Sequence, residues 1–344
     1  MKINVWNTIQ QLSKERGVNT TVIVNAIKES LRVAATQYFS HNENIIIDLA
    51  PEKGQLRVYV VKKVVEKSLD LASEISLSDA QLIDEEAALD QSIEIDLPSA
   101  TLGRIAAQAA KQVIYQKVRN AEQDRIYHLF APQIGEMVTG VLRRFEPNQN
   151  MVLEVSKVEV LLPAREKLTG EEFIRGDRVR AVVTQVTRDD MDHQVYVSRT
   201  APRFLKKLLE IEIPEIGNGH IEIMDICRQP GERSKVAVFT KEKDIDPVGS
   251  CIGVKGNRIL AISKELQGEK IDIIVYSNDP LEYAKSALSP AKPDRVIMLN
   301  QQERALQAIV SNDQLSLAIG KKGMNVRLAS RLVGWKIDIK SNRE

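Results

Sequence analysis

The sequence predicts a multidomain α+β protein with a helical and sheet N-terminal domain, a five-stranded β-barrel and two tandem α-β-β-α-α-β units. A chain of 344 residues is too long for one ordinary domain. Five short strand-like runs crowd into residues 133–199, and residues 200–344 contain an internal repeat. We therefore place domains at residues 1–132, 133–199, 200–278 and 279–344.

The N-terminal 132 residues mix helical and extended patterns. Apolar residues recur at helical spacing over residues 4–16 and 19–39. Two β-branched runs, 44–49 and 56–65, flank turn-forming residues and predict a hairpin. A short helix over 78–83, a strand over 93–97 and a long helix over 102–129 follow. The polar side of the long helix is interpreted as the solvated face of a connecting helix.

Residues 133–199 carry strands punctuated by turn residues. The strand runs are 134–141, 151–155, 158–162, 179–186 and 194–198. Five short strands in so few residues are typical of an OB-fold barrel. A small SH3-like barrel is the structural alternative, and strand spacing alone does not separate the two.

The repeat in residues 200–344 is marked by two pairs of matching segments. Ile252-Gly253-Val254-Lys255-Gly256 matches Ile319-Gly320-Lys321-Lys322-Gly323, 67 residues later, and Lys270-Ile271-Asp272-Ile273 matches Lys336-Ile337-Asp338-Ile339, 66 residues later. Each copy predicts helix, strand, strand, helix, GxxG loop, helix and strand. In each Ile-Asp-Ile segment we expect the isoleucines to supply core and the aspartate to be exposed.

A GxxG turn between two helices suits the binding of a sugar-phosphate chain. Glycines lack Cβ, so the backbone can adopt strained angles and approach a ligand closely. The following helix offers unpaired N–H groups and its positive end to a phosphate. This is the design of the KH domain, here type II, whose GxxG loop clamps single-stranded RNA. A lone GxxG is often a helix cap, but two copies in matched context favour a functional role.

The candidate RNA-binding residues lie around the two loops and on the barrel. The first clamp is Gly253, Val254, Lys255, Gly256 and Arg258, and the second is Gly320, Lys321, Lys322, Gly323 and Arg327. The barrel offers Arg143, Arg144, Arg178 and Arg180, with Phe145 and Tyr196 as stacking candidates. Basic residues on a small barrel are usually only solvated, and Phe145 could equally belong to the core.

The positive charge of the chain is concentrated in residues 200–344, the same part in which the motifs predict RNA binding. Residues 200–344 carry 23 Lys and Arg against 19 Asp and Glu, whereas residues 1–132 carry 15 against 17 and residues 133–199 carry 10 against 11. The short link at 277–279 predicts that the two repeats pack rigidly and read one continuous RNA segment.

Several function classes find no support in the sequence. Cys227 and Cys251 form neither a disulfide framework nor a CxxC, and the four histidines are scattered, so we expect no metal site and a reduced, cytoplasmic setting. No apolar run approaches the roughly 18 residues of a membrane span. Catalytic motifs such as GxxxxGK[ST], HExxH and GxSxG are missing, so we predict neither an enzyme nor a cofactor.

Several further segments, spread along the chain, match the sequence pattern of a known protein family. They are Gly103 to Ile114, Arg175 to Arg180, Ile213 to Ile216, Asp246 to Gly253, Ser316 to Gly320, and Gly334 to Ile339. With the order of modules, they resemble the NusA family of bacterial transcription factors.

The resemblance implies a function that composition alone does not show. Residues 1–132 would bind the RNA polymerase core, and the remaining domains would bind nascent single-stranded RNA. A monomer of this kind would lengthen hairpin pauses, assist termination and, with other antitermination factors and a ribosomal small-subunit protein, serve antitermination. Two alternatives stay open: an RNA scaffold or chaperone without polymerase contact, and an RNA-degrading enzyme, since KH and OB units also occur in exoribonucleases.

Overall fold

The computed structural model of the chain describes residues 45–50, 55–70, 72–96, 99–188 and 194–342, with isolated positions 21, 25, 28, 29, 32 and 33. The helix predicted over 4–16 therefore lies outside the described residues, and of the helix predicted over 19–39 only those isolated positions are described. The chain divides into two compact units, Met1–Ile126 and Tyr127–Glu344. Each unit is described by itself.

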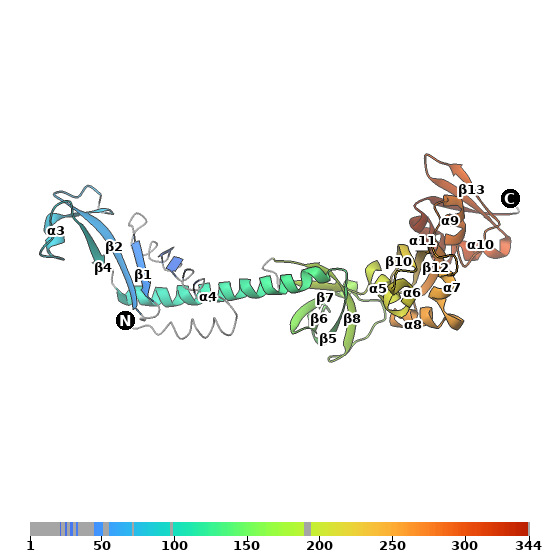
Figure 1. Cartoon of the computed structure of the whole chain (residues 1–344), viewed down its shortest axis with the longest axis horizontal. Helices are drawn as coiled ribbons and strands as arrows, with labels where there is room; N and C mark the ends of the chain where they lie inside the picture. The colour runs from blue at the N-terminus through green and yellow to red at the C-terminus, as the bar shows by residue number, and fades with distance from the viewer. Residues whose placement is uncertain are drawn as a thin grey trace. The chain divides into compact units, whose positions relative to one another are not determined.

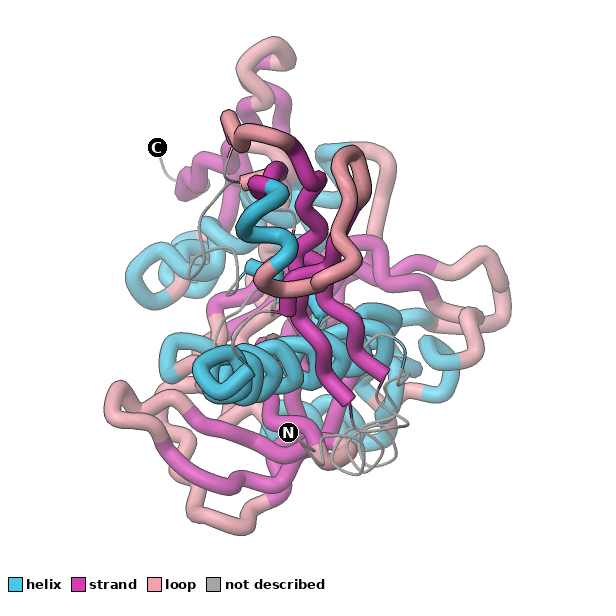
Figure 2. Tube along the Cα trace, turned by 90° about the vertical axis from the view of Figure 1, so that its left-hand side faces the viewer, coloured by secondary structure: helices cyan, strands magenta, loops and turns pink. Residues whose placement is uncertain are grey.

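The first unit contains a small sheet with a short helix at one end (Figures 1 and 2). Its elements are β1 (Ile45–Ala50), β2 (Gln55–Val65), β3 (Glu74–Ser76), α3 (Leu77–Gln81) and β4 (Ser92–Asp96), and α4 (Ser99–Phe130) continues from it into the second unit. β1 and β4 both pair antiparallel with β2, which confirms the hairpin and the third strand. Val64, Ala80 and Ile93 form a local core that holds α3 on the sheet. Ser76 caps α3 by accepting a hydrogen bond from the Asp79 N–H.

The parallel strand β3 was not predicted from the sequence. It is three residues long and pairs with the end of β2 through Lys63, Val64 and Val65. Three residues are too few to display a period-2 pattern, so only the neighbouring long strand reveals it.

The second unit begins with a closed barrel. Its strands are β5 (Met137–Phe145), β6 (Met151–Val155), β7 (Val158–Leu162), β8 (Arg178–Val186) and β9 (Val195–Ser198), in the order β5-β6-β7-β9-β8. The parallel contact of Leu161 with Tyr196 closes the ring. This closed five-stranded barrel is OB-like, as the strand rhythm predicted.

Two KH units follow with the predicted order of elements, except that the first has an additional short helix, α6, before its first strand. The first is α5 (Pro202–Glu212), α6 (Pro214–Gly217), β10 (Glu222–Gln229), β11 (Arg233–Phe239), α7 (Pro247–Ile252), α8 (Asn257–Glu265) and β12 (Lys270–Val275). The second is α9 (Pro280–Ala287), β13 (Arg295–Asn300), β14 (Ala305–Val310), α10 (Asn312–Ile319), α11 (Met324–Val333) and β15 (Lys336–Ser341). In each three-stranded sheet the central strand pairs antiparallel with the earlier strand and parallel with the later one.

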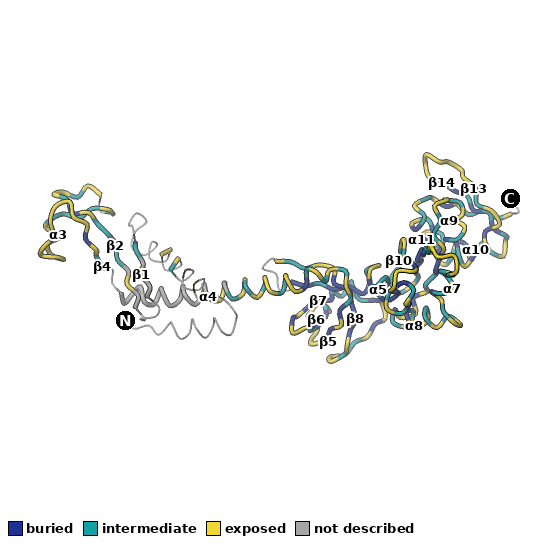
Figure 3. Tube along the Cα trace, in the orientation of Figure 1, coloured by how far each residue is buried: buried dark blue, intermediate teal, exposed yellow. Residues whose placement is uncertain are grey.

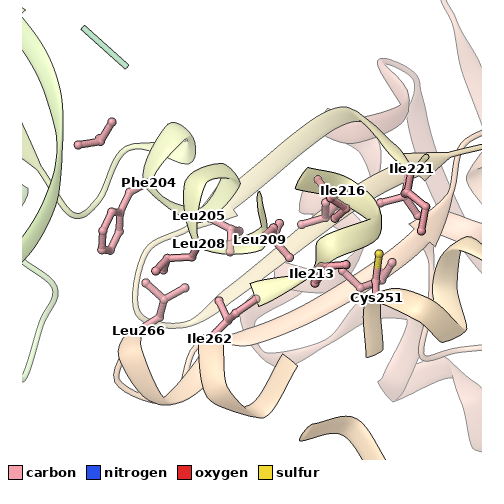
Figure 4. Packing of buried hydrophobic residues seen from close by; sticks show 14 of the residues in the cluster. Phe204, Leu205, Leu208, Leu209, Ile213, Ile216, Ile221, Cys251, Ile262 and Leu266 are labelled. Atoms are coloured by element: carbon pink, nitrogen blue, oxygen red, sulfur yellow. The ribbon is translucent and has the colours of Figure 1, made fainter. Parts of the chain in front are cut away.

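The barrel and the first KH unit share one core. Leu168 and Val182 of the barrel belong to the same buried cluster as Phe204 and Leu205 of α5, and the last two are labelled in Figure 4. Beside this cluster, the Arg199 guanidinium is 3% exposed, and its Nε donates to Glu171 at 2.7 Å. Its Nη1 reaches Glu265 of α8 at 3.1 Å. Moving Glu265 away would leave this buried charge less compensated, so the pair opposes separation of the barrel from the first KH unit.

The two KH units also share a core, and Figure 3 shows buried residues among the elements of both. Ala237 and Ile274 of the first sheet cluster with Ala284 of α9 and Ala329 of α11. The buried Lys235 ammonium bonds Asp272 at 3.0 Å and the Ser289 carbonyl of the second unit at 2.7 Å.

The expectation that both Ile-Asp-Ile aspartates are exposed is therefore half wrong. Asp338 is exposed on the second sheet. Asp272 is 14% exposed, because the second KH unit covers the face of the first sheet on which this carboxylate lies. A short sequence window does not reveal such a domain interface.

No helix in the described part of the chain is long and apolar enough to cross a membrane.

Candidate nucleic-acid interface

The two GxxG loops have nearly the same backbone. α7 ends at Gly253 with φ 73° and ψ 176°, and α10 ends at Gly320 with φ 75° and ψ 169°. Two residues after this glycine stands a lysine with φ 52° in both copies, Lys255 and Lys322. Gly256 and Gly323 are left-handed and start α8 and α11. The sequence repeat is thus a repeat of loop geometry.

The two glycines of each loop serve different purposes. A Cβ on Gly253 would lie 2.5 Å from the Asn257 Oδ1, and one on Gly320 would lie 2.8 Å from the Asn325 backbone nitrogen. The first glycine is needed for packing. A Cβ on Gly256 would meet only Leu260 at 3.9 Å, and no atom of the described structure lies within 4 Å of one on Gly323. The second glycine therefore leaves open space beside the loop, into which a ligand backbone can come.

The predicted basic residues differ in whether they are free to bind a phosphate or are already held in a salt bridge. Lys255, Lys321, Lys322 and Arg327 are exposed, and none has an ion pair within the part of the chain that the structure describes. Each can meet a phosphate without first breaking a salt bridge. Their N–H donors lie next to the amino ends of α8 and α11, where the helix dipole also favours an anion.

Arg258 is engaged inside the protein. Its Nη1 lies 2.9 Å from Glu215 and donates to the Ser250 carbonyl at 2.6 Å, and the side chain is 29% exposed. A hydrogen bond from the Glu215 backbone, together with Arg258, lowers the pKa of the Glu215 carboxyl. Two residues after the second glycine of the other loop stands Asn325, which is buried and donates to the Ala318 carbonyl at 3.0 Å. Both side chains hold the end of the preceding helix, so the role of Arg258 in RNA binding stays a prediction.

Most barrel arginines are paired as well. Arg143 bonds Glu154 at 2.8 Å, Arg180 bonds Glu265 at 2.6 Å, and Arg144 forms a two-pronged pair with Glu159. Arg178 is exposed and has no carboxylate partner among the described residues. Phe145 is 50% exposed, so it is available for stacking and does not belong to the core.

Alignment of the loops also reveals Leu260, which motif reasoning missed, and shows that Val254, predicted as part of the first clamp, is not matched by an apolar residue in the second loop. Leu260 occupies the place of Arg327, and Val254 occupies that of Lys321. Both are exposed apolar side chains. Comparison of the two repeats position by position would have found Leu260, whereas a search for basic residues passes over it.

The described residues contain no cluster of three or more possible metal ligands. The two cysteines have no catalytic features, because burial raises the pKa of Cys227 to about 11 and that of Cys251 to about 12.

Family models match three segments of the chain. Residues 4–124 match the NusA N-terminal domain, residues 199–276 the NusA-like first KH domain, and residues 280–344 the NusA-like second KH domain. A solved structure, the N-terminal domain of NusA from Bacillus subtilis in solution, is 37% identical, with a TM-score of 0.31 over 36% of this chain and 99% of that one.

Curated relatives match over nearly the whole sequence. The transcription termination/antitermination protein NusA of Bacillus subtilis is 43% identical over 100% of this chain and 92% of its own length. The proteins of the same name from Thermus thermophilus and Rickettsia prowazekii are 37% and 34% identical, over 96% and 99% of this chain and 87% and 68% of their own lengths. None of these names describes an enzyme. The chain belongs to the NusA family of transcription termination/antitermination proteins.

Proposed function

We propose that this protein binds nascent single-stranded RNA through its two KH units and acts on transcription termination and antitermination. The observation that carries the proposal is the pair of matched GxxG loops, each with an open second glycine and exposed cations. Phosphates would bind the loop N–H groups and the lysines, and unstacked bases would extend along the adjacent surface. The family of the chain and its two KH matches support RNA binding.

The N-terminal domain is proposed to bind the RNA polymerase core. Residues 4–124 match the NusA N-terminal domain, and family resemblance assigns polymerase binding to this module. The chain would then hold emerging RNA close to the enzyme, lengthening hairpin pauses and assisting termination. Other antitermination factors and a ribosomal small-subunit protein are the further proposed partners, and a cytoplasmic monomer is the proposed state.

The barrel is proposed as a third, weaker RNA contact. Arg178 should contribute more than Arg143, Arg144 or Arg180, because it has no salt bridge to break before meeting a phosphate. Exposed Phe145 can stack on a base.

The test is the dwell time of bacterial RNA polymerase at a hairpin pause, with the intact chain, with residues 1–98 deleted so that α4 stays whole, and with Gly256→Asp/Gly323→Asp. We expect the intact chain to lengthen the pause and both variants to lose the effect. The glycine variant should still bind polymerase, and the deletion should still bind RNA. An intact chain that binds RNA but leaves the dwell time unchanged would point instead to a scaffold or chaperone.

A further inference from the structure

The two clamps have the same backbone but different surface chemistry. In the first loop the variable positions are Val254 and Lys255, and in the second they are Lys321 and Lys322. One turn into the following helix, Leu260 stands where the second copy has Arg327.

The apolar residues of the first clamp are unusually exposed. Val254 is 79% exposed and Leu260 is 63% exposed, although both are large aliphatic side chains. The Leu260 Cδ1 lies 3.9 Å from the position of a Cβ on Gly256, so this methyl group borders the open space beside the second glycine. We call Val254 and Leu260 the apolar shelf. Neither belongs to the core cluster of the first KH unit, so the fold does not depend on burying them.

The charge of the two clamps differs in the same sense. Lys255 is the one unpaired cation of the first clamp among the described residues, because Glu215 pairs with Arg258. The second clamp presents Lys321, Lys322 and Arg327, all exposed. The space beside Gly323 is not bordered by an aliphatic group, since no described atom comes within 4 Å of a Cβ there.

We propose that the two KH units bind one RNA by different chemistry, the second clamp holding phosphates and the apolar shelf of the first holding the face of an unstacked nucleobase. The inference rests on the proposed RNA-binding function and assigns a part to each half of the site. The flat face of a nucleobase is apolar and can pack against aliphatic side chains. In single-stranded RNA this face is exposed, because the base lacks the stacking partners of a duplex. Aliphatic side chains can cover such a face where aromatic residues are scarce, as they are in this chain, with 4% Phe, Trp and Tyr.

Salt separates the two kinds of contact. Each phosphate neutralised by a cation contributes about 0.7 to the slope of log affinity against log salt for single strands, because bound counterions are released. Apolar contact releases no ions. Contacts of the shelf should therefore change the affinity without changing this slope.

The experiment measures binding of the whole chain to a labelled, mixed-sequence single-stranded RNA of about 12 nucleotides, by fluorescence anisotropy from about 50 to 300 mM KCl. Val254→Ser/Leu260→Ser should weaken binding about fivefold to tenfold at every salt concentration, with the slope unchanged. Lys321→Gln/Lys322→Gln/Arg327→Gln should reduce the slope by about 2.

A matched control and a converse variant complete the design. Met298→Ser/Leu299→Ser removes an exposed apolar pair on β13, outside both GxxG loops, and should leave RNA binding as in the parent. Val254→Lys/Leu260→Arg gives the first clamp the charge pattern of the second, and should raise the slope by about 1.4 while weakening binding at high salt. Thermal unfolding checks that each variant is folded.

The outcomes separate this inference from the proposed function. If the serine pair binds RNA like the parent while the charge-removed triple variant binds weakly, the shelf does not hold a base and the function stands. If the serine pair lowers the slope, the contact is electrostatic and the inference fails. If the serine pair shortens polymerase pauses without affecting RNA affinity, the shelf contacts a protein and the inference is overturned. If the triple variant and Gly256→Asp/Gly323→Asp all bind RNA normally, the proposed function itself is wrong.

Discussion

Four loop glycines show how one motif combines two physical requirements. Gly253 and Gly320 sit where a Cβ would collide with the following helix, and Gly256 and Gly323 sit in left-handed backbone beside open space. The sequence presents all four as the same residue in the same motif. Only the positions of neighbouring atoms distinguish a glycine required for packing from one that leaves room for a ligand.

Replacement of the second glycines should separate binding from folding. In Gly256→Asp/Gly323→Asp the new carboxylates face the open space beside each loop where RNA is proposed to lie, so RNA affinity should fall at least about tenfold at low salt through charge repulsion from the phosphates. The left-handed backbone costs an aspartate about 1 kcal/mol at each site, which leaves the fold intact. Anisotropy and circular dichroism on the same sample provide the check. Unchanged RNA affinity would rule out the clamp assignment.

Replacement of the first glycines should have the reverse effect. Gly320→Ala places a methyl group 2.8 Å from the Asn325 backbone nitrogen, which cannot move away, and should cost about 2 to 4 kcal/mol of stability. Gly253→Ala should cost less, because the atoms it meets belong to the side chains of Asn257 and Arg258, which can turn away. Urea unfolding of the two single variants measures the difference. Equal stabilities would show that this contact does not decide the cost.

At the scale of elements, the sequence predicted most of what the structure contains. Alternating apolar residues and turn chemistry located the barrel strands and the hairpin, and the internal repeat located both KH units. The prediction failed where the deciding contact comes from a distant element. β3 needs β2 to be recognised, and Asp272 is covered by the second KH unit. Choosing between the OB-like and the SH3-like barrel required the pairing order of the strands, which a local sequence pattern does not contain.

The candidate site was predicted less completely, because a basic side chain can bind RNA readily only if it is not held in a salt bridge within the protein. Arg180 is basic and close to a motif, but its partner Glu265 lies 85 residues later in the sequence. Arg258 likewise meets Glu215, 43 residues earlier. The exposed loop lysines needed no such knowledge, since a loop of two glycines and two other residues offers them little to pack against.

Buried Lys235, at the interface between the two KH units, predicts that the stability of the protein depends on pH. Burial lowers the pKa of the Lys235 ammonium to about 8, against the attraction of Asp272. Between that value and the ordinary 10.5, the unfolded chain keeps a proton that the folded chain has lost. Below pH 8 the lysine is protonated in both states and adds no pH dependence. As the pH rises from 8 toward 10.5, folding releases the proton, so the free energy of unfolding increases.

Lys235→Met should remove this dependence. The parent should gain about 2 kcal/mol of stability relative to the variant between about pH 7.5 and 9.5, measured by urea unfolding. Arg233 donates to Asp272 at 2.7 Å and should keep this pair in the variant, so the remaining carboxylate is compensated. The exposed Lys336→Met is the matched control and should show no such trend. A parent-to-variant difference that does not change with pH would contradict the assignment.

At the scale of the whole molecule, shared cores decide which parts can move independently. The barrel contributes Leu168 to the core of the first KH unit, and the first sheet contributes Ala237 to the core of the second. Buried pairs reinforce both junctions, with Arg228 and Glu269 fully buried next to the Arg199 carbonyl. A rigid body of this kind fixes the spacing of its two clamps, so an RNA bound at one meets the other at high effective concentration.

This organisation predicts how the chain unfolds. Residues 99–344, which keep α4 whole, should unfold in one cooperative transition, because neither KH unit nor the barrel retains a complete core once its neighbour is lost. The intact chain should show the same transition and a second one from the N-terminal unit, whose sheet has its own small core. Differential scanning calorimetry measures both, and agreement of the calorimetric and van't Hoff enthalpies tests cooperativity. Bound RNA should raise only the transition of the KH-containing part, since a ligand stabilises only the unit that binds it. Separate melting of the barrel and the two KH units would show that the shared cores are too weak to couple them, and would remove the reason for expecting one RNA to bridge both clamps at fixed spacing.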